Sequence, residues 1–208
     1  MNMAPPDPTD AASYDKELAK VTVGGVQPLT APIEIRNYDP EWPRLYRRED
    51  ARIRSVLGER VVRIAHAGST SVPGLPAKPV IDIVLEVPDS AKEPTYVPDL
   101  EAAGYVLRIR EPEWFEHRLL KGPDANINLH VFSSACAEVD RMLLFRDWLR
   151  SSDADRELYA TAKRELADCD WKYTQQYADA KTAVVRDIMS RAQAASPHLR
   201  AAKTSQPG

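Results

Sequence analysis

Residues 66–82 read His-Ala-Gly-Ser-Thr-Ser-Val-Pro-Gly-Leu-Pro-Ala-Lys-Pro-Val-Ile-Asp. The stretch leaves an apolar, strand-like run, turns at Gly68-Ser69, passes through a Pro/Gly-rich loop that carries one lysine, and reaches Asp82 in a second strand-like run. Backbone donors, a hydroxyl, a cation and a carboxylate are therefore expected at the ends of adjacent strands. This combination suits a phosphate or a metal-bound nucleotide.

Asp82 is the most informative single residue, because it lies between Ile81 and Ile83 and aspartate is depleted in strands. A buried carboxylate without a partner is costly, so a partner or a metal is expected. If the strand that holds Asn128 and His130 neighbours the Asp82 strand, the imidazole approaches the carboxylate. Histidines with Asp82 would make a metal site; the alternative is a His–Asp hydrogen bond that closes a polar pocket.

The overall composition limits the classes of function. The chain has 208 residues, a hydrophobic fraction of 43% and a formal charge of −3, which favours one domain with tails and gives no basic field for nucleic acid. Its two cysteines have no metal or disulfide spacing. Apolar runs fall short of the ~20 residues that span a bilayer, and the N-terminus lacks the pattern of a signal peptide. We expect a cytoplasmic protein without membrane association.

The apolar patterning predicts a flexible N-terminal tail at 1–30, a folded domain at 31–193 and a flexible C-terminal tail at 194–208. Within the first tail, 21–23 could add a short edge strand. Strands are predicted at 33–36, 61–66, 80–87, 105–109, 114–121 and 127–132, and helices at 42–57, at 98–103 and after residue 135. Strands enclosed by helices indicate a mixed sheet with helices packed on it, an α+β fold.

Several further side chains are candidates for an anion site. Lys78 precedes a proline that holds it extended, so it can reach an anion or remain solvated. Arg146 is pushed to the edge of a core stripe, where it either lines an anion pocket or forms a surface ion pair. Lys181 lies one helical turn after Tyr177 and could belong to the same rim. His117, at a predicted strand position, is the fourth candidate.

A set of motifs resembles the GrpB family over about residues 33–192. The motifs are Tyr38-Asp39-Pro40 with Trp42, the whole 66–82 stretch, Gly104-Tyr105, His117-Arg118, the Asn-Leu-His-Val run at 128–131, Phe145-Arg146-Asp147 with Leu149-Arg150, Tyr159 with Lys163, and Tyr177 with Lys181. The resemblance implies a fold of the nucleotidyltransferase-like superfamily. A related domain occurs fused to dephospho-coenzyme A kinase in some bacteria.

The superfamily pattern is a Gly-Ser pair, an acid-x-acid pair and a third acid on a later strand. Gly68-Ser69 matches the first element, and Asp82 matches the first acid of the pair. Val84 stands at the second acid position, and the third acid position falls near His130. The site implied is catalytic at Asp82 and His130, which either hold Mg²⁺ or Mn²⁺ or act as a base. Its ligand-binding residues are Gly68, Ser69, Thr70, Lys78, His117, Arg118, Arg146 and Lys181.

Two functions follow from this reading. The first is a divergent nucleotidyltransferase-type transferase that binds a nucleotide or another anionic small molecule. The second is a non-catalytic ligand-binding or regulatory module on the same fold, which the missing acids favour because two-metal phosphoryl transfer needs them. An unrelated enzyme chemistry on this fold is a third possibility.

Overall fold

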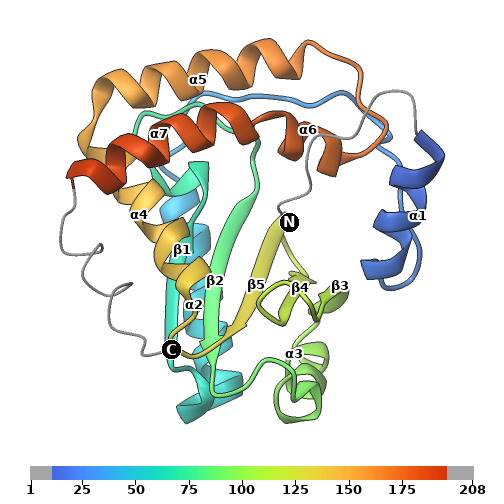
Figure 1. The fold of residues 1–208 in the computed structure, drawn as a ribbon. Helices are drawn as coiled ribbons and strands as arrows, with labels where there is room; N and C mark the ends of the chain where they lie inside the picture. Colours follow the sequence, from blue (N-terminus) through green and yellow to red (C-terminus); the bar gives the residue numbers. More distant parts are fainter. Residues whose placement is uncertain (1–10, 196–208) are drawn as a thin grey trace, which may run out of the picture.

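The computed structural model describes residues 11–195, which form a five-stranded sheet and seven α-helices (Figure 1). The strands are β1 (Arg63–Ala67), β2 (Ile81–Val87), β3 (Val106–Glu111), β4 (His117–Lys121) and β5 (Ile127–Ser133). The helices are α1 (Ala11–Val21), α2 (Trp42–Leu57), α3 (Val97–Ala102), α4 (Ala137–Ser151), α5 (Asp153–Ala167), α6 (Thr174–Ala180) and α7 (Thr182–Ala195). Among these, no helix is both long and apolar enough to cross a membrane.

The sheet is mixed, with strand order β1-β2-β5-β4-β3. β2 and β5 run parallel, and the other neighbouring pairs are antiparallel. Asp82 lies opposite Ala67 on one side and Asn128 on the other, and His130 lies opposite Val84. Because side chains alternate between faces, Asp82, Asn128 and His130 share one face of the sheet. The predicted α+β fold with a mixed sheet is confirmed.

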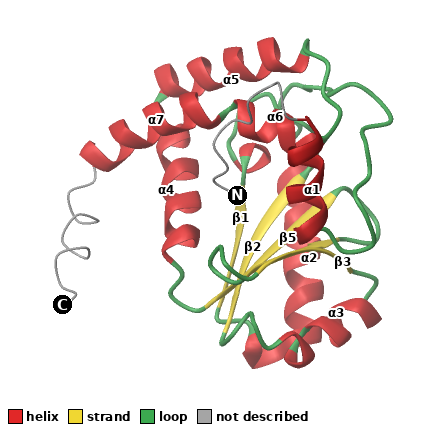
Figure 2. Ribbon diagram, turned by 45° about the vertical axis from the view of Figure 1, so that its right-hand side comes forward, coloured by secondary structure: helices red, strands yellow, loops and turns green. Residues whose placement is uncertain are grey.

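The opposite face is closed by α2 and α3 (Figure 2). Ile81, Ile83 and Leu85 are at most 1% exposed there and belong to the same apolar cluster as Trp42 and Ile53 of α2. The α2 sequence carries apolar residues at helical spacing, has a proline in its first turn, and ends at Gly58 with a φ of 57°. We call this side of the sheet the closed face.

The face that carries Asp82, which we call the open face, is covered differently. α4 packs on it through Val139 and Leu143, which contact Phe132 of β5. α5, α6 and α7 lie across the end of the sheet where β2 begins (Figure 1). Between these helices the open face lines a cavity, described below.

The N-terminal region differs from the prediction. Residues 11–30 were expected to belong to a flexible tail, but α1 packs through the buried Tyr14 and Leu18, and Thr22 forms a single bridge to Ile109 of the edge strand β3. One turn separates the two apolar residues, so a single stripe anchors this short helix. The packed chain therefore begins before the predicted boundary at 31. The tail predictions for 1–10 and 196–208 lie outside the described residues.

Two predicted strands are shorter than expected. The strand predicted at 33–36 is reduced to one bridge between Arg36 and Ala77. The strand predicted at 114–121 begins only at His117, because Phe115 and Glu116 have φ values of 54° and 50°. Positive φ angles belong to the left-handed region and are incompatible with a strand. The residues from 112 to 116 thus form a turn, which places His117 at the first position of β4.

Candidate ligand-binding site

The Gly-Ser turn and Asp82 are in direct contact. Gly68 has a φ of 64°, and a Cβ placed on it would lie 2.3 Å from Oδ2 of Asp82. A side chain at this position would therefore collide with the carboxylate. The glycine permits the turn after β1 to pass against the first carboxylate of β2, as the spacing of the 66–82 stretch predicted.

The parallel pairing of β2 and β5 gives Asp82 its polar neighbours. Asn128 Nδ2 donates to Asp82 Oδ1 over 2.7 Å, and Asn128 Oδ1 accepts from Lys121 Nζ over 2.6 Å. His130 Nε2 lies 3.6 Å from Asp82 Oδ1. Burial alone would raise the pKa of Asp82, but His130, Asn128 and Lys181 hold it below the usual range. Asp82 is therefore an anion at neutral pH.

A row of imidazoles extends from Asp82 to a second carboxylate. His117 Nδ1 lies 2.7 Å from Glu111 Oε2, and His117 Nε2 lies 3.1 Å from His130 Nδ1. Burial lowers the pKa of His117 to about 4, so this imidazole is neutral even though Glu111 acts in the opposite direction. Its one N–H then belongs on Nδ1, facing Glu111, and its Nε2 accepts from His130 Nδ1. This leaves His130 Nε2 on the side of Asp82.

These groups line a cavity of about 730 Å³ between the open face and α1, α4, α5 and α6. Its charged lining residues are Lys78, Arg108, Lys121, Arg141, Lys163 and Lys181 against Asp82, Glu111 and Glu138. Arg141 is paired with Glu138, and Glu111 is held by His117. The wall around Asp82 is therefore cationic, although the whole chain has a charge of −3.

The four lysines of the cavity, Lys78, Lys121, Lys163 and Lys181, form no ion pair with a carboxylate of the described residues and lie against neutral groups. Among residues 11–195, the lysines found in ion pairs are Lys20, Lys92 and Lys172, none of which lines the cavity. Lys78 and Lys181 lie over the Tyr177 ring, 5.7 and 4.3 Å from its centroid. The remaining two amines donate to oxygens of Asn128 and Pro76, the latter from Lys163.

Burial and mutual repulsion lower the pKa of these lysines. The pKa of Lys181 is lowered to about 8 by burial and then by Lys78, with Asp82 acting in the opposite direction. That of Lys163 is lowered to about 6, again by burial first and then by Lys181. Lys78 and Lys121 shift in the same direction. A bound anion would offset this repulsion, because it favours the charged form of each amine.

Tyr177, which lines the cavity, carries a hydroxyl that is itself buried and unpartnered among the described residues. The residue is 2% exposed, and its hydroxyl forms no hydrogen bond among the described residues. A buried hydroxyl without a partner costs about 1–3 kcal/mol. The same residue lines the cavity and lies beneath Lys78 and Lys181.

The donor set around Asp82 does not fit the expected Mg²⁺ or Mn²⁺. Both ions prefer several oxygen ligands, whereas the neighbours of Asp82 here are an amide, an imidazole and ammonium groups. Val84 occupies the second acid position and is buried in the apolar cluster beneath α4. Within residues 11–195, no group of three or more His, Cys, Asp and Glu side chains has the arrangement of a metal site.

Most of the predicted site residues come together in the cavity. Those that line it are Gly68, Ser69, Lys78, Asp82, His117, His130 and Lys181. Thr70 does not line it, since its hydroxyl donates to the Val80 carbonyl and lies 3.0 Å from Nε2 of His66. His66 itself points to the closed face, where it stacks on Tyr46 with ring centroids 4.9 Å apart.

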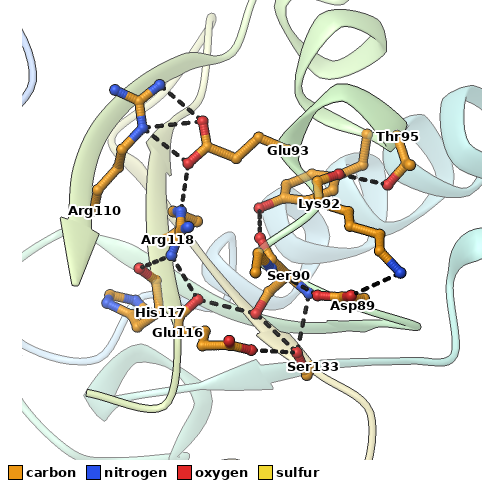
Figure 3. A network of polar contacts seen from close by, with 12 residues as sticks. Asp89, Ser90, Lys92, Glu93, Thr95, Arg110, Glu116, His117, Arg118 and Ser133 are labelled. Carbon is orange, nitrogen blue, oxygen red and sulfur yellow. Dashed lines mark hydrogen bonds and ion pairs between the residues drawn. The ribbon is translucent and has the colours of Figure 1, made fainter. Parts of the chain in front are cut away.

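Two predicted ligand-binding arginines also lie away from the cavity. Arg146 Nη1 donates to the His66 carbonyl over 2.9 Å, so it braces the Gly-Ser turn from behind. Arg118 points to the other side of β4, as Figure 3 shows, where its Nε donates to Glu93 over 2.5 Å. Glu93 is also held by Arg110. This network ties the segment after β2 to the sheet. It occupies the guanidinium of Arg118, so this side chain is not free to bind a ligand in the cavity.

Lys121 and Lys163 were missed as site residues. Alternation along β4 places Lys121 on the same face as His117, which is a signal that the sequence does contain. The second signal is a repeated Tyr-x-x-x-Lys spacing. Lys163 lies 4.8 Å from the ring centroid of Tyr159, just as Lys181 lies over Tyr177. In each pair the lysine lies four positions after the tyrosine, so α5 and the C-terminal end of α6 present matching tyrosine–lysine pairs.

Comparisons with known proteins agree with this architecture. The family described as GrpB protein matches residues 32–191, which is most of the chain. The chain belongs to the GrpB family. It is 61% identical over 180 residues to a UPF0157 protein of Halalkalibacterium halodurans, covering 86% of this chain and 92% of that protein. The family resemblance predicted from the motifs is thus confirmed.

Two further GrpB comparisons define the extent of the likeness. The crystal structure of conserved protein GrpB from Enterococcus faecalis superposes with a TM-score of 0.68 at 28% identity, covering 76% of this chain and 96% of that chain. A dephospho-CoA kinase of Mycolicibacterium paratuberculosis is 30% identical over 191 residues, covering 78% of this chain but 46% of the kinase. The GrpB-like part is therefore a complete protein in some relatives and a fraction of a longer one in others.

Proposed function

We propose that this GrpB protein binds a nucleotide or another phosphorylated small molecule in the cavity on the open face. The observation that carries the proposal is the group of four lysines without carboxylate partners around Asp82, in a chain whose net charge is negative. Ammonium groups bind phosphate oxygens as point charges. Lys78, Lys121 and Lys181 would bind the anionic part of the ligand.

Asp82 has an ordering role in this proposal. It anchors Asn128, which in turn holds Lys121, and it faces His130. A carboxylate inside an anion site also rejects phosphate oxygens, so the ligand would lie on the lysine side of the cavity. The expected result for Asp82→Asn is a protein that still binds the anion with altered affinity, because the replacement keeps the shape and removes the charge.

A transferase is the second candidate, and the row Glu111–His117–His130 favours it. In that function His130 Nε2, beside Asp82, would accept the proton of an attacking hydroxyl. The fold relationship to nucleotidyltransferases implied by the motifs supports a nucleotide as substrate, and the donor set argues against the two-metal mechanism of that superfamily. Turnover of labelled nucleotide that Asp82→Asn and His130→Gln abolish would favour transfer over binding alone.

Isothermal titration with ATP, pyrophosphate and tripolyphosphate, with and without Mg²⁺, tests the binding proposal. A ligand at 100 times its Kd should also raise the unfolding free energy by roughly 2.7 kcal/mol. Replacing Lys181 by Met should weaken binding about tenfold or more, the effect of a lost charged hydrogen bond. Lys92→Met is the matched control, since Lys92 is an exposed lysine paired with Asp89. Equal effects of the two substitutions, or no binding of any of the three anions, would contradict the proposal.

A further inference from the structure

We infer that residues 11–27, which precede the part matched by the GrpB family, select the uncharged part of the ligand. The inference rests on the proposed anion site. It adds that the ligand carries, next to its anionic part, a neutral group of nucleoside size. We call residues 11–27 the strap. Its residues Leu18, Thr22, Gly25, Val26 and Gln27 line the same cavity as the lysines, whereas the family match begins at residue 32.

The cavity has two chemically different parts. One surrounds Asp82 and carries the four lysines. The other lies between the strap and the edge strand β3 with its neighbour β4, where Ile109 and Leu119 are paired in the sheet and both line the wall. The charged groups of β3 and β4 at this wall are Arg108, which approaches Gly24, Glu111, which is held by His117, and Lys121, which donates to Asn128. The strap residues that line the wall are all uncharged. A wall of this kind suits a part of the ligand that carries no charge.

The volume supports a ligand larger than a bare phosphate. Pockets for organic ligands span about 300–1,000 Å³, and this cavity measures about 730 Å³. A phosphate group held by the lysines would leave the strap side unfilled. Trp114 and Gln27 also line the cavity. The Trp114 indole packs against His117 and Phe132 on the α4 side of the cavity. Gln27 belongs to the strap, and its amide can hydrogen-bond to the edge of a heterocycle, so a nucleoside suits this part.

The strap is fixed at both ends of its span. At the sheet, Thr22 bridges to Ile109, and the backbone N–H of Val23 donates to the Arg108 carbonyl over 2.8 Å. At α6, the Tyr14 hydroxyl donates to Asp179 Oδ2 over 2.8 Å, and the Tyr14 ring stacks on Tyr173. The strap therefore crosses from the sheet edge to the helix that carries Tyr177.

The glycine pair at 24 and 25 lets the strap turn back over the cavity. Both residues have positive φ values, 77° and 83°. Consecutive residues in this region make a tight turn that other side chains resist. After the turn, Val26 packs with the cluster of Tyr14, Leu18 and Tyr173. Val26 thus faces the cavity from a supported position, where a larger side chain would occupy the space proposed for the neutral group.

The experiment compares two ligands that share a triphosphate. Isothermal titration of the full chain with tripolyphosphate measures the anionic part alone, and titration with ATP adds the nucleoside. Val26→Trp should weaken ATP about tenfold or more and change tripolyphosphate by less than about twofold. Lys121→Met should weaken both ligands by a similar factor. Val106→Trp, at an exposed valine of β3 that does not line the cavity, is the matched control.

The outcomes separate this inference from the proposed function. If Lys121→Met weakens both ligands but Val26→Trp leaves ATP unchanged, the anion site stands and the inference is overturned. If the wild-type chain binds tripolyphosphate but gains nothing from the nucleoside, the inference is also overturned. If it binds neither ligand, the proposed function fails and the inference falls with it. Gln27→Trp, at an exposed position, repeats the test if Val26→Trp does not fold.

Discussion

The two faces of the sheet are built from the same strands but differ in how completely they are buried and in what packs against them. Along β2, Ile81, Ile83 and Leu85 point to the closed face and are at most 1% exposed, while the Asp82 side chain on the open face is 26% exposed. The closed face meets α2 and α3 in one apolar cluster. The open face packs on α4 through a smaller apolar cluster and, beside it, borders a cavity lined by lysines.

This difference separates the residues that stabilise the fold from those of the proposed binding site. Apolar burial on the closed face contributes most of the free energy of folding. On the open face the chain keeps unpaired cations and the unpartnered Tyr177 hydroxyl, both of which cost free energy in the unliganded protein. The lysines that converge on one cavity are the groups that the proposed ligand would satisfy. Substitutions on the two faces should therefore change different measurements.

The largest expected effect is on the closed face. Leu129 of β5 is fully buried in the apolar cluster, so Leu129→Ala should lower the unfolding free energy by about 2–5 kcal/mol. Anion affinity, measured where the variant is folded, should remain within about twofold. Lys121→Met, on the open face of the neighbouring strand, should weaken anion binding but leave the unfolding free energy nearly unchanged, because it removes a repelled cation. A comparable loss of stability in both variants would contradict the assignment of stability mainly to the closed face.

A second large effect should appear on acidification. Burial lowers the pKa of His66, on the closed face, to about 4, while Asp82 acts in the opposite direction. The unfolded chain takes up this proton near pH 6.5, so between pH 6.5 and 4 it binds more protons than the folded chain. Stability is complete above about pH 6.5 and should fall by up to about 3 kcal/mol as the pH drops through 4.

The control for that effect is His66→Gln, whose amide can still donate to Thr70 but does not titrate. Urea unfolding at several pH values should give a flatter profile for the variant than for the wild type. Parallel profiles would show that His66 is not the group responsible. His117, also buried and neutral, remains in both proteins and cancels in the difference.

A smaller effect, at the border between the faces, should separate backbone strain from steric collision. Gly68→Ala and Gly58→Ala both place a side chain at a positive φ, 64° and 57°. At Gly58 the new Cβ meets open space, whereas at Gly68 it lies 2.3 Å from Asp82 Oδ2. Gly68→Ala should therefore cost about 1–3 kcal/mol more than Gly58→Ala in thermal unfolding, and it alone should weaken anion binding. Equal losses of stability in the two variants would show that the Asp82 carboxylate does not lie against Gly68.

The sequence was a good guide where a local pattern determines the outcome. Alternation in β2 gave the two faces, Gly58 gave the end of α2, and the Asp82 strand lies beside the His130 strand as supposed. It was a poor guide where a contact depends on distant elements. Arg118 was predicted to bind a ligand because it lies next to His117 in the sequence. Its actual partner, Glu93, lies in the segment after β2, and the local sequence does not indicate this contact.

The cavity itself followed from the sequence only in part. Lys78 and Lys181 were identified, but Lys121 and Lys163 join them only because β4 and α5 converge on Asp82 in the fold. α1 was missed because its two buried residues, Tyr14 and Leu18, make too short a stripe to stand out from a tail. Their partners, Tyr173 and Asp179, lie more than 150 positions later in the chain.

The smallest expected effect is a pH dependence confined to the open face. Burial and Lys78 lower the pKa of Lys181 to about 8 in the free protein. A bound anion stabilises the charged amine and raises that pKa, so binding takes up a proton above pH 8 and affinity should fall as the pH rises, by at most tenfold per unit. Lys181→Arg keeps its charge throughout this range. Titration with tripolyphosphate between pH 7 and 9.5 should therefore give a flatter profile for Lys181→Arg than for the wild type, and an equally steep profile would assign the titration to another lysine.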